Sequence, residues 1–212
     1  MNNVREKESI KEFNKWAESY DKNFWSLYFK SAYHHVLALS EKYINHDSKI
    51  LDVGCGTGDL AFLVSKKATE GKVVGLDISQ QMIELAQKKK LERNISNVQF
   101  INSRANSIPY ENEYFDLVFC LNALHHIPDH PSFFQETNRV LKKDGRFVIL
   151  DLIKDNIIRK AWLWVSKFIF GEKDIEYHSR KDFLKFLRNA GFEPEIQKSF
   201  LFFTLISISK KL

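Results

Sequence analysis

The sequence predicts an α/β protein whose seven-stranded sheet is mostly parallel, with an antiparallel last strand and helices on both faces. From residue 49 onward, short apolar strands alternate with helices, which predicts parallel strands joined by right-handed crossovers. The strands are almost continuously apolar, as expected for a sheet that is buried on both sides. The last two strands are joined too tightly for a crossover, so we expect them to pair antiparallel. Sheets of this kind bind ligands at the carboxyl ends of their strands.

Turn residues and helix caps bound each predicted element. In chain order, the strands are expected at residues 49–53, 72–77, 98–102, 115–121, 146–151, 195–199 and 202–209. The helices are expected at residues 59–69, from the N-cap Ser79 to about 93, 131–141 and 179–191. Pro131 suits a first helical turn, and Ser179 with Asp182 has capping-box spacing. A turn at Asp144 and Gly145 is expected to precede the fifth strand.

Two segments lie outside this alternation. Residues 1–46 are expected to be helical, because Phe13, Trp16, Tyr20 and Phe24 recur at a helical spacing. Residues 152–178 form an insertion between the fifth strand and the last helix. We therefore expect one domain over residues 1–212, with an additional segment at each of these two places.

Composition excludes several classes of protein. The chain has 212 residues, of which 44% are hydrophobic and 28% charged, so it is not disordered or of low complexity. No apolar run is long enough to span a bilayer, and the charged N-terminus lacks the apolar core of a secretory signal. Two cysteines are typical of a reducing compartment, so we expect a cytoplasmic protein with free thiols.

The net charge of +5 permits contact with nucleic acid or an anionic membrane. The basic residues, however, occur in short clusters such as 88–90, mostly near the ends of predicted helices, where they complement the helix dipole. We interpret them mainly as solvated faces and keep a functional patch as the alternative.

A glycine-rich turn between the first strand and its helix predicts a nucleotide-like ligand. Gly54, Gly56 and Gly58 follow the G-x-G-x-G spacing, and Asp59 occupies the position where a dinucleotide site has its third glycine. Asp52 and Asp59 flank the turn, and their charges would repel a pyrophosphate. A phosphate-free ligand that carries an ammonium and a sulfonium suits such a turn far better.

A third acid strengthens this choice. Asp77 ends the second strand, about 20 residues after the turn, where a carboxylate can accept hydrogen bonds from ribose hydroxyls. Together these features favour S-adenosylmethionine over NAD or ATP. A P-loop is excluded, because no Gly-Lys-Ser/Thr ends the turn.

These residues carry a family resemblance. The chain resembles class I S-adenosylmethionine-dependent methyltransferases of Rossmann-like fold, and is most similar to the ubiquinone/menaquinone-biosynthesis branch (the type 11 methyltransferase domain). The matching segments are residues 16–21, 52–58, 73–79, 108–118, 122–129 and 139–145. The resemblance implies an N-terminal helical lid (1–46), a cofactor-binding core (47–151), a cap insertion (152–178), and a closing helix and strands (179–212).

The resemblance also implies which residues hold the cofactor, with S-adenosylhomocysteine as its product. The cofactor-binding residues that it implies are Tyr20, Asp52, Gly54, Cys55, Gly56, Gly58, Asp77, Ile78, Met82, Ala105 and Leu121. One departure concerns the adenine. The family often has an acid before the alanine, whereas this chain has Arg104, which cannot accept a hydrogen bond. Either Ser103 or Asn106 serves instead, or cofactor affinity is reduced.

The turn after the fourth strand carries the catalytic candidates. Methyl transfer depends chiefly on positioning, and a general base is needed only where the nucleophile must lose a proton. Asn122, His125 and His126 lie in this turn, and His125 or His126 could remove such a proton. The alternative is that both histidines orient the loop or cap the next helix. The other histidines show no metal-ligand spacing, so no metal is expected.

The insertion indicates the kind of acceptor. Residues 157–170 combine a helical apolar stripe with two tryptophans and three basic residues. They are read either as a cap helix over the pocket or as an interfacial helix that makes peripheral membrane contact. In either interpretation the helix helps to enclose an apolar pocket, so we expect a small hydrophobic or aromatic substrate. The sequence leaves the acceptor atom and the oligomeric state open.

Three alternatives remain. The first is a methyltransferase that acts on a macromolecule, RNA, DNA or protein. The mildly basic charge would suit a nucleic acid, but the chain lacks the Asn/Asp-Pro-Pro-aromatic tetrad and an appended RNA-binding domain, so no nucleic acid is expected. A non-catalytic, cofactor-binding partner subunit is the second alternative. A nicotinamide oxidoreductase is the third, and Asp59 disfavours it.

Overall fold

The computed structural model describes residues 10, 14, 25–155, 177–200 and 204–212. Its centre is a seven-stranded sheet in the order β3-β2-β1-β4-β5-β7-β6. The strands are β1 (Lys49–Val53), β2 (Lys72–Asp77), β3 (Val98–Asn102), β4 (Phe115–Leu121), β5 (Leu141–Leu152), β6 (Phe192–Phe200) and β7 (Thr204–Lys211). The predicted fold class is confirmed: β1 to β5 pair in parallel, and β7 is antiparallel to both of its neighbours.

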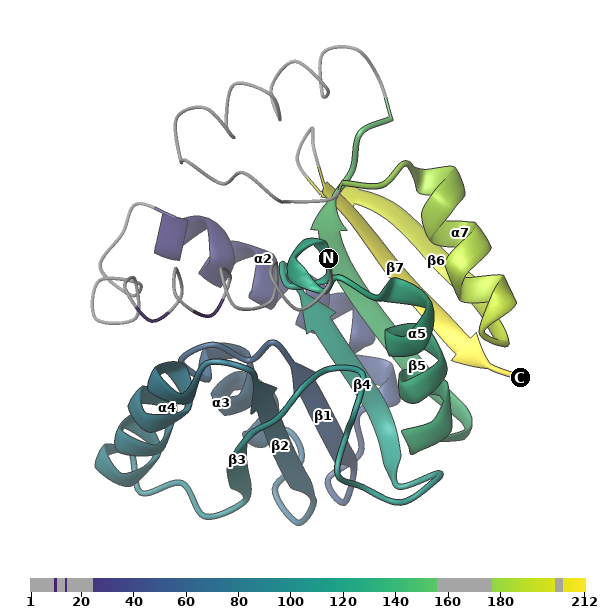
Figure 1. Ribbon diagram of the computed structural model, residues 1–212. Helices are drawn as coiled ribbons and strands as arrows, with labels where there is room; N and C mark the ends of the chain where they lie inside the picture. The colour runs from purple at the N-terminus through teal and green to yellow at the C-terminus, as the bar shows by residue number, and fades with distance from the viewer. Residues whose placement is uncertain (1–9, 11–13, 15–24, 156–176, 201–203) are drawn as a thin grey trace.

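Helices cover both faces of the sheet (Figure 1). The helices are α2 (Trp25–Ser40), α3 (Asp59–Ser65), α4 (Gln80–Glu92), α5 (His130–Val140) and α7 (Arg180–Asn189), with short 3-10 turns η2 (Glu41–Tyr43) and η3 (Leu124–His126). Alternate strand residues such as Ile50 and Phe119 pack against α2, α3 and α4. Their neighbours in the sequence, Leu51 and Val118, pack against α5 and α7. This explains why the strands are apolar at almost every position.

The caps that the sequence predicts are formed. The Ser79 hydroxyl accepts the Met82 amide at 3.2 Å and begins α4, and Ser179 with Asp182 forms a capping box for α7. Asp129, which the sequence reading did not identify, caps α5 by accepting the Ser132 amide at 3.1 Å.

Several predicted boundaries are wrong. Strand β6 begins at Phe192 rather than at 195, and β7 runs from Thr204 to Lys211 rather than over 202–209. Two larger differences have a visible cause. Helix α3 ends at Ser65 rather than at residue 69, and the Asn97 side chain donates to the carbonyls of Ser65 and Ala68 at 3.0 and 2.8 Å. This cap comes from a distant residue, so the local sequence does not reveal it. Strand β5 begins at Leu141 rather than at 146, because Asp144 (φ +62°) lies within the strand beside a register shift.

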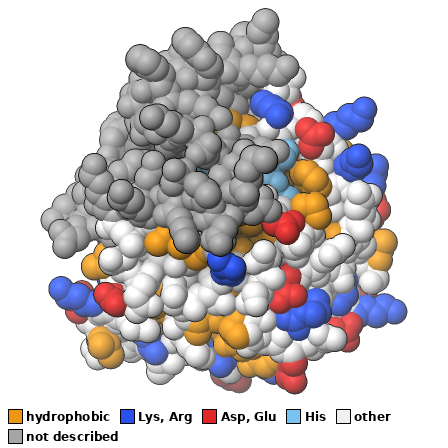
Figure 2. All heavy atoms as spheres, in the orientation of Figure 1, with side chains coloured by type: hydrophobic (Ala, Val, Ile, Leu, Met, Phe, Trp, Pro, Cys, Tyr) orange, Lys and Arg blue, Asp and Glu red, His pale blue; other side chains and the backbone are white. Residues whose placement is uncertain are grey.

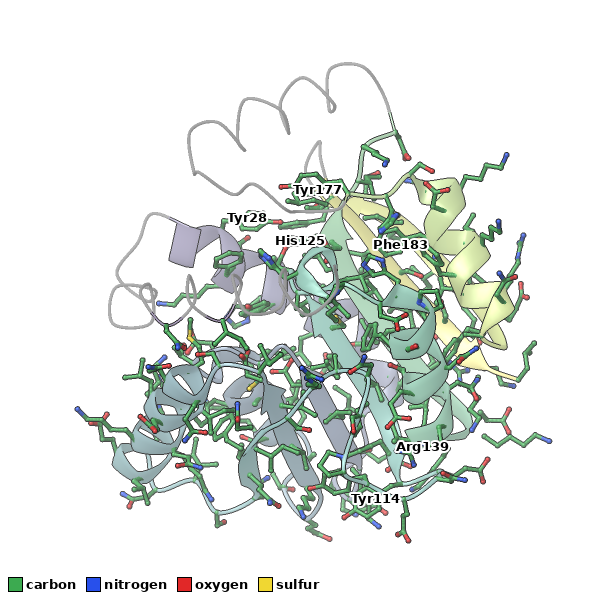
Figure 3. All side chains as sticks on the ribbon, in the orientation of Figure 1. Tyr28, Tyr114, His125, Arg139, Tyr177 and Phe183 are labelled. Carbon is green, nitrogen blue, oxygen red and sulfur yellow. The ribbon has the colours of Figure 1, made fainter. Side chains whose placement is uncertain are left out.

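The carboxyl ends of the parallel strands meet at one edge of the sheet, where the labelled Tyr28, His125 and Tyr177 gather (Figure 3). Arg139 and Tyr114 lie toward the opposite edge. There Arg139 donates to the carbonyls of Ile108 and Tyr110 at 2.9 and 2.7 Å and fixes the connection between β3 and β4. The carboxyl edge is therefore where a ligand site is expected.

Candidate active site

The glycine loop after β1 forms one wall of a cavity at this edge. The Gly54 and Cys55 amides both donate to the Leu76 carbonyl, at 2.7 and 3.0 Å, which ties the loop to the end of β2. Gly54 and Gly56 have φ angles of +72° and +51°. A Cβ on Gly54 would lie 2.4 Å from the Ala123 Cβ, whereas a Cβ on Gly56 would meet nothing within 4 Å. The loop thus touches the turn after β4 at one glycine and opens into the cavity at the other.

Asp77 holds this loop in place. Its carboxylate accepts the Gly56 amide at 2.8 Å and the Ser79 amide at 2.9 Å, so it joins the glycine loop to the start of α4. Burial raises the pKa of this carboxyl, and the amide donors oppose that rise. Each carboxylate oxygen still has acceptor capacity for a hydroxyl group in the cavity.

Asp52 lies behind the loop and is 2% exposed. Burial, together with the nearby charge of Asp77, raises the pKa of Asp52 to about 8, while the Ala61 amide acts in the opposite direction. Its Oδ2 atom is buried, and no hydrogen-bond partner for it occurs among the described residues. An acceptor left in this state suits a ligand with a cationic donor group.

Most of the predicted cofactor residues meet at the cavity. Its walls include Gly54, Cys55, Gly56, Asp77, Ile78, Met82, Ala105 and Leu121. Asp52 and Gly58 are not among the lining residues: Asp52 lies beneath the loop, and Gly58 (φ +89°) is the N-cap of α3. Tyr20 lies outside the described residues. Arg104 does line the cavity, next to Ser103 and Asn106.

An aromatic wall of the same cavity comes from the N-terminal segment, which was expected to help enclose an apolar pocket, but its residues were not identified from the sequence. Phe29 and Tyr33 of α2 line it, with their rings stacked at a centroid distance of 6.4 Å. The turn after β4 supplies further lining residues, Asn122, Ala123, Ile127 and Pro128. The helical spacing of Phe29 and Tyr33 could have identified this wall, but nothing local showed that α2 folds over the loop.

The two candidate histidines have different surroundings. His126 lines the cavity, and burial together with the adjacent His125 lowers its pKa well below the usual value. His125 is not a lining residue; its Nδ1 atom lies 2.6 Å from Asp151 Oδ1. Asp151 is 1% exposed and also accepts the amides of His125 and Leu152, at 3.3 and 2.6 Å. The structure thus pairs His125 with a buried acid, and the sequence reading did not identify Asp151.

Aromatic side chains surround this His–Asp pair. The ring of Tyr177 lies 5.8 Å from that of His125. Tyr28 is at the same edge of the sheet (Figure 3), where burial, together with the charge of Asp151, raises the pKa of its hydroxyl. Tyr28 belongs to α2, and Tyr177 follows the insertion, so segments from distant parts of the chain meet here. On the face seen in Figure 2, histidine and apolar side chains adjoin in the upper half, and acidic and basic side chains are interspersed above and below them.

Two further histidines and the two cysteines are packed inside the fold. His178 Nε2 lies 3.1 Å from His130 Nδ1, and His130 Nε2 lies 3.0 Å from the Leu124 carbonyl, so the pair braces η3. Cys55 and Cys120 are free and buried, and burial raises the pKa of both thiols well above the usual value. Within the described ranges, no three potential ligands cluster as a metal site would require.

The chain matches the family model of the methyltransferase domain over residues 44–188. It is 30% identical to the ubiquinone/menaquinone biosynthesis C-methyltransferase of Campylobacter jejuni, with 98% of this chain and 99% of that protein covered. It is 29% identical to the demethylmenaquinone methyltransferase of Oceanobacillus iheyensis, with 71% of each covered. The structure of a SAM-dependent methyltransferase from Aquifex aeolicus superposes with a TM-score of 0.68 at 20% identity, covering 84% of this chain and 89% of that one.

The chain belongs to the methyltransferase domain family. This family and the Rossmann-like fold are those that the sequence predicted. In the part of the chain that the structure describes, no helix has the length and apolar character needed to cross a bilayer. Residues 157–170 lie outside the described residues, so the membrane contact remains a prediction.

Proposed function

We propose that this protein is an enzyme that transfers the methyl group of S-adenosylmethionine to a small hydrophobic or aromatic acceptor. The observation that carries the proposal is the pairing of His125 with Asp151 at 2.6 Å, beside a glycine-loop cavity and among aromatic side chains. A cofactor site alone would not require a buried His–Asp pair. Such a pair has a chemical use where an acceptor must lose a proton.

The residues of the cavity fit the cofactor. Gly56 opens into the cavity without a neighbour at the position of a Cβ, so a ligand can approach the backbone there. Asp77 can accept the ribose hydroxyls while it keeps the Gly56 and Ser79 amides. The orphan Oδ2 of Asp52 suits the ammonium group, directly or through water. Ile78, Met82 and Ala105 would contact the adenine, with Leu121 beneath. When bound, S-adenosylmethionine supplies an electrophilic methyl group on a sulfonium.

His125 is the proposed general base. A donor role of its Nδ1–H toward Asp151 would fix the neutral tautomer in which Nε2 is the basic nitrogen, so Nε2 is the atom that would take up the proton. The Asp151 carboxylate then stabilises the imidazolium that forms. His126 is held neutral by burial and by its neighbour, so it lines the cavity as a polar but uncharged side chain. The structure thus supports a division of roles between two histidines that the sequence treated alike.

The aromatic surroundings support an apolar acceptor. Phe29 and Tyr33 line the cavity. Tyr177 lies beside His125, and Tyr28 is at the same edge of the sheet. The relatives named for demethylmenaquinone and ubiquinone/menaquinone biosynthesis point to the same chemistry. We infer that the acceptor is an aromatic compound with an ionisable hydroxyl group, which can be methylated on the oxygen or on an adjacent ring carbon.

The test is methyl transfer from labelled S-adenosylmethionine to reduced naphthoquinones with short prenyl chains, and to simple naphthols. We expect a methylated product from at least one member of this panel, identified by mass spectrometry. Transfer RNA and bulk protein are tested in parallel. Label in either of these and in no small acceptor would contradict the proposal. Stoichiometric S-adenosylhomocysteine binding without turnover on any acceptor would instead favour a non-catalytic subunit.

A further inference from the structure

Three consecutive lysines, 88–90, lie near the end of α4, and their side chains have different surroundings. Lys88 is exposed, as expected for a solvated face. Lys89, in contrast, points back toward the glycine loop: its ammonium donates to Thr57 Oγ1 at 2.8 Å and lies 3.3 Å from Asp59 Oδ1. The two side chains of the Lys89–Asp59 ion pair are 18% and 28% exposed. The charge cluster that the sequence assigned to solvent therefore contains one member that contacts the cofactor loop.

Thr57 and Asp59 both line the cofactor cavity. Thr57 is 2% exposed and stands between Gly56 and Gly58, two residues of positive φ. Glycine-rich backbone has many accessible conformations, so a loop of this kind needs external contacts to hold one shape. Loop amides that donate to the Leu76 carbonyl and to the Asp77 carboxylate fix the beginning of the loop. Lys89, which belongs to α4, contacts the second half of the loop through Thr57 and Asp59.

Lys89 also changes the charge of the site. The sequence interpretation placed an acid on each side of the loop, Asp52 and Asp59. The structure pairs Asp59 with Lys89, whereas Asp52 and Asp77 have no basic partner within the described residues. The acids that can favour a cationic ligand therefore lie on the side of Asp52 and Asp77, and the charge of Asp59 at the start of α3 is compensated.

We propose that Lys89 is a positioning residue for cofactor binding: it fixes Thr57 and compensates Asp59, so that the glycine loop is preorganised before the cofactor arrives. The consequence is a lower cost of ordering on binding. The proposal depends on the cofactor but on neither the acceptor nor the histidines, so failure of the proposed methylation would leave it standing.

The experiment compares Lys89→Met, Lys89→Arg and the exposed control Lys88→Met by calorimetric titration with S-adenosylhomocysteine. We expect Lys89→Met to weaken binding about tenfold, because a charge-assisted hydrogen bond and an ion pair are lost. Lys89→Arg should rescue most of this loss, and Lys88→Met should bind as the wild type does. Thermal melting confirms that the variants are folded. Equal affinity in Lys89→Met and the wild type, or an equal loss in Lys88→Met, would overturn the proposal.

A double-mutant cycle with Asp59→Asn separates positioning from general loosening of the fold. Since Lys89 compensates Asp59, removal of both charges should cost less affinity than the two single losses combined. In turnover assays, Lys89→Met should raise the KM for S-adenosylmethionine and leave kcat within about twofold. Additive losses in the cycle, or a fall in kcat with unchanged KM, would count against the role.

Discussion

The carboxyl edge of the sheet has two halves that are built in different ways. At the ends of β1 and β2, the site consists of backbone amides and two buried acids, Asp52 and Asp77, that end two adjacent strands. At the ends of β4 and β5, it consists of side chains from α2, η3, the end of β5 and the segment after the insertion. The β1–β2 half suits one invariant ligand, the cofactor. The β4–β5 half could accommodate different methyl acceptors through replacement of a few side chains.

The electrostatics of the two halves differ as well. Asp52 and Asp77 have pKa values that burial raises, and they offer negative charge to a cation at an energetic cost. Asp151 has a partner in His125, and the pKa of His126 is lowered. The β1–β2 half is therefore prepared to bind a positive ligand, and the β4–β5 half to accept a proton.

The largest expected effect comes from His125. His125→Asn keeps an N–H that can donate to Asp151 but has no lone pair to replace Nε2. We expect kcat to fall about 10²- to 10³-fold, the usual contribution of a general base. Affinity for S-adenosylhomocysteine should change less than about twofold, because His125 does not line the cofactor cavity. Steady-state kinetics and calorimetry on the same variant measure both quantities.

His126→Asn is the matched control for this prediction. It changes a cavity-lining residue of the same turn but leaves the His125–Asp151 pair intact. Its effect on kcat should be much smaller. If His126→Asn lowers kcat as much as His125→Asn does, the assignment of the base is wrong. If neither variant lowers kcat, both histidines are structural, and the β4–β5 half only shapes the pocket.

The next effect concerns two glycines of the loop, Gly54, which contacts the turn after β4, and Gly56, which does not. Gly54→Ala adds a methyl group 2.4 Å from the Ala123 Cβ at a φ of +72°. Strain and overpacking should together lower the free energy of unfolding by about 2–4 kcal/mol. Gly56→Ala has the strain but no neighbour within 4 Å, so it should cost about 1–2 kcal/mol. Urea unfolding measures both values.

Gly56→Ala should affect cofactor binding more than it affects stability. The new methyl group of Gly56→Ala fills space where the cofactor approaches the backbone, so its loss of S-adenosylhomocysteine affinity should exceed its loss of stability. Calorimetry on the folded variant checks this. Unchanged affinity in Gly56→Ala would show that the ligand does not approach this glycine, and that the loop is only a tight turn.

What the sequence could predict follows the same division. Gly54, Gly56, Asp52 and Asp77 were identifiable because their roles depend on spacing along the chain, and the structure places them together. The partnership of His125 with Asp151 joins two strand ends that are 26 residues apart, and sequence spacing does not show which acid a histidine reaches. The same reason explains why the aromatic wall of α2 was missed: its partners come from the tertiary packing of a separate segment.

The last expected effect is a pH dependence that belongs to the β1–β2 half. The folded-state pKa of Asp52 is raised from 3.8 to about 8, so between these pH values the folded protein keeps a proton that the unfolded chain has released. The free energy of unfolding should therefore decrease as the pH rises through this window, by at most about 1.4 kcal/mol per pH unit from this group. Asp52→Asn should remove this contribution. Urea unfolding at several pH values measures it, with the exposed Asp47→Asn as control.

The ligand provides the decisive comparison for Asp52. An ammonium group next to its orphan Oδ2 favours the ionised carboxylate, so S-adenosylhomocysteine binding near neutral pH should release up to one proton. Calorimetry in buffers of different ionisation enthalpy detects this release, and Asp52→Asn should abolish it. Proton release that persists in Asp52→Asn would move the effect to Asp77 and remove the reason for a buried, unpaired acid behind the loop. No release in the wild type would mean that the ammonium group binds elsewhere, and that the contrast between the two halves lies in their geometry alone.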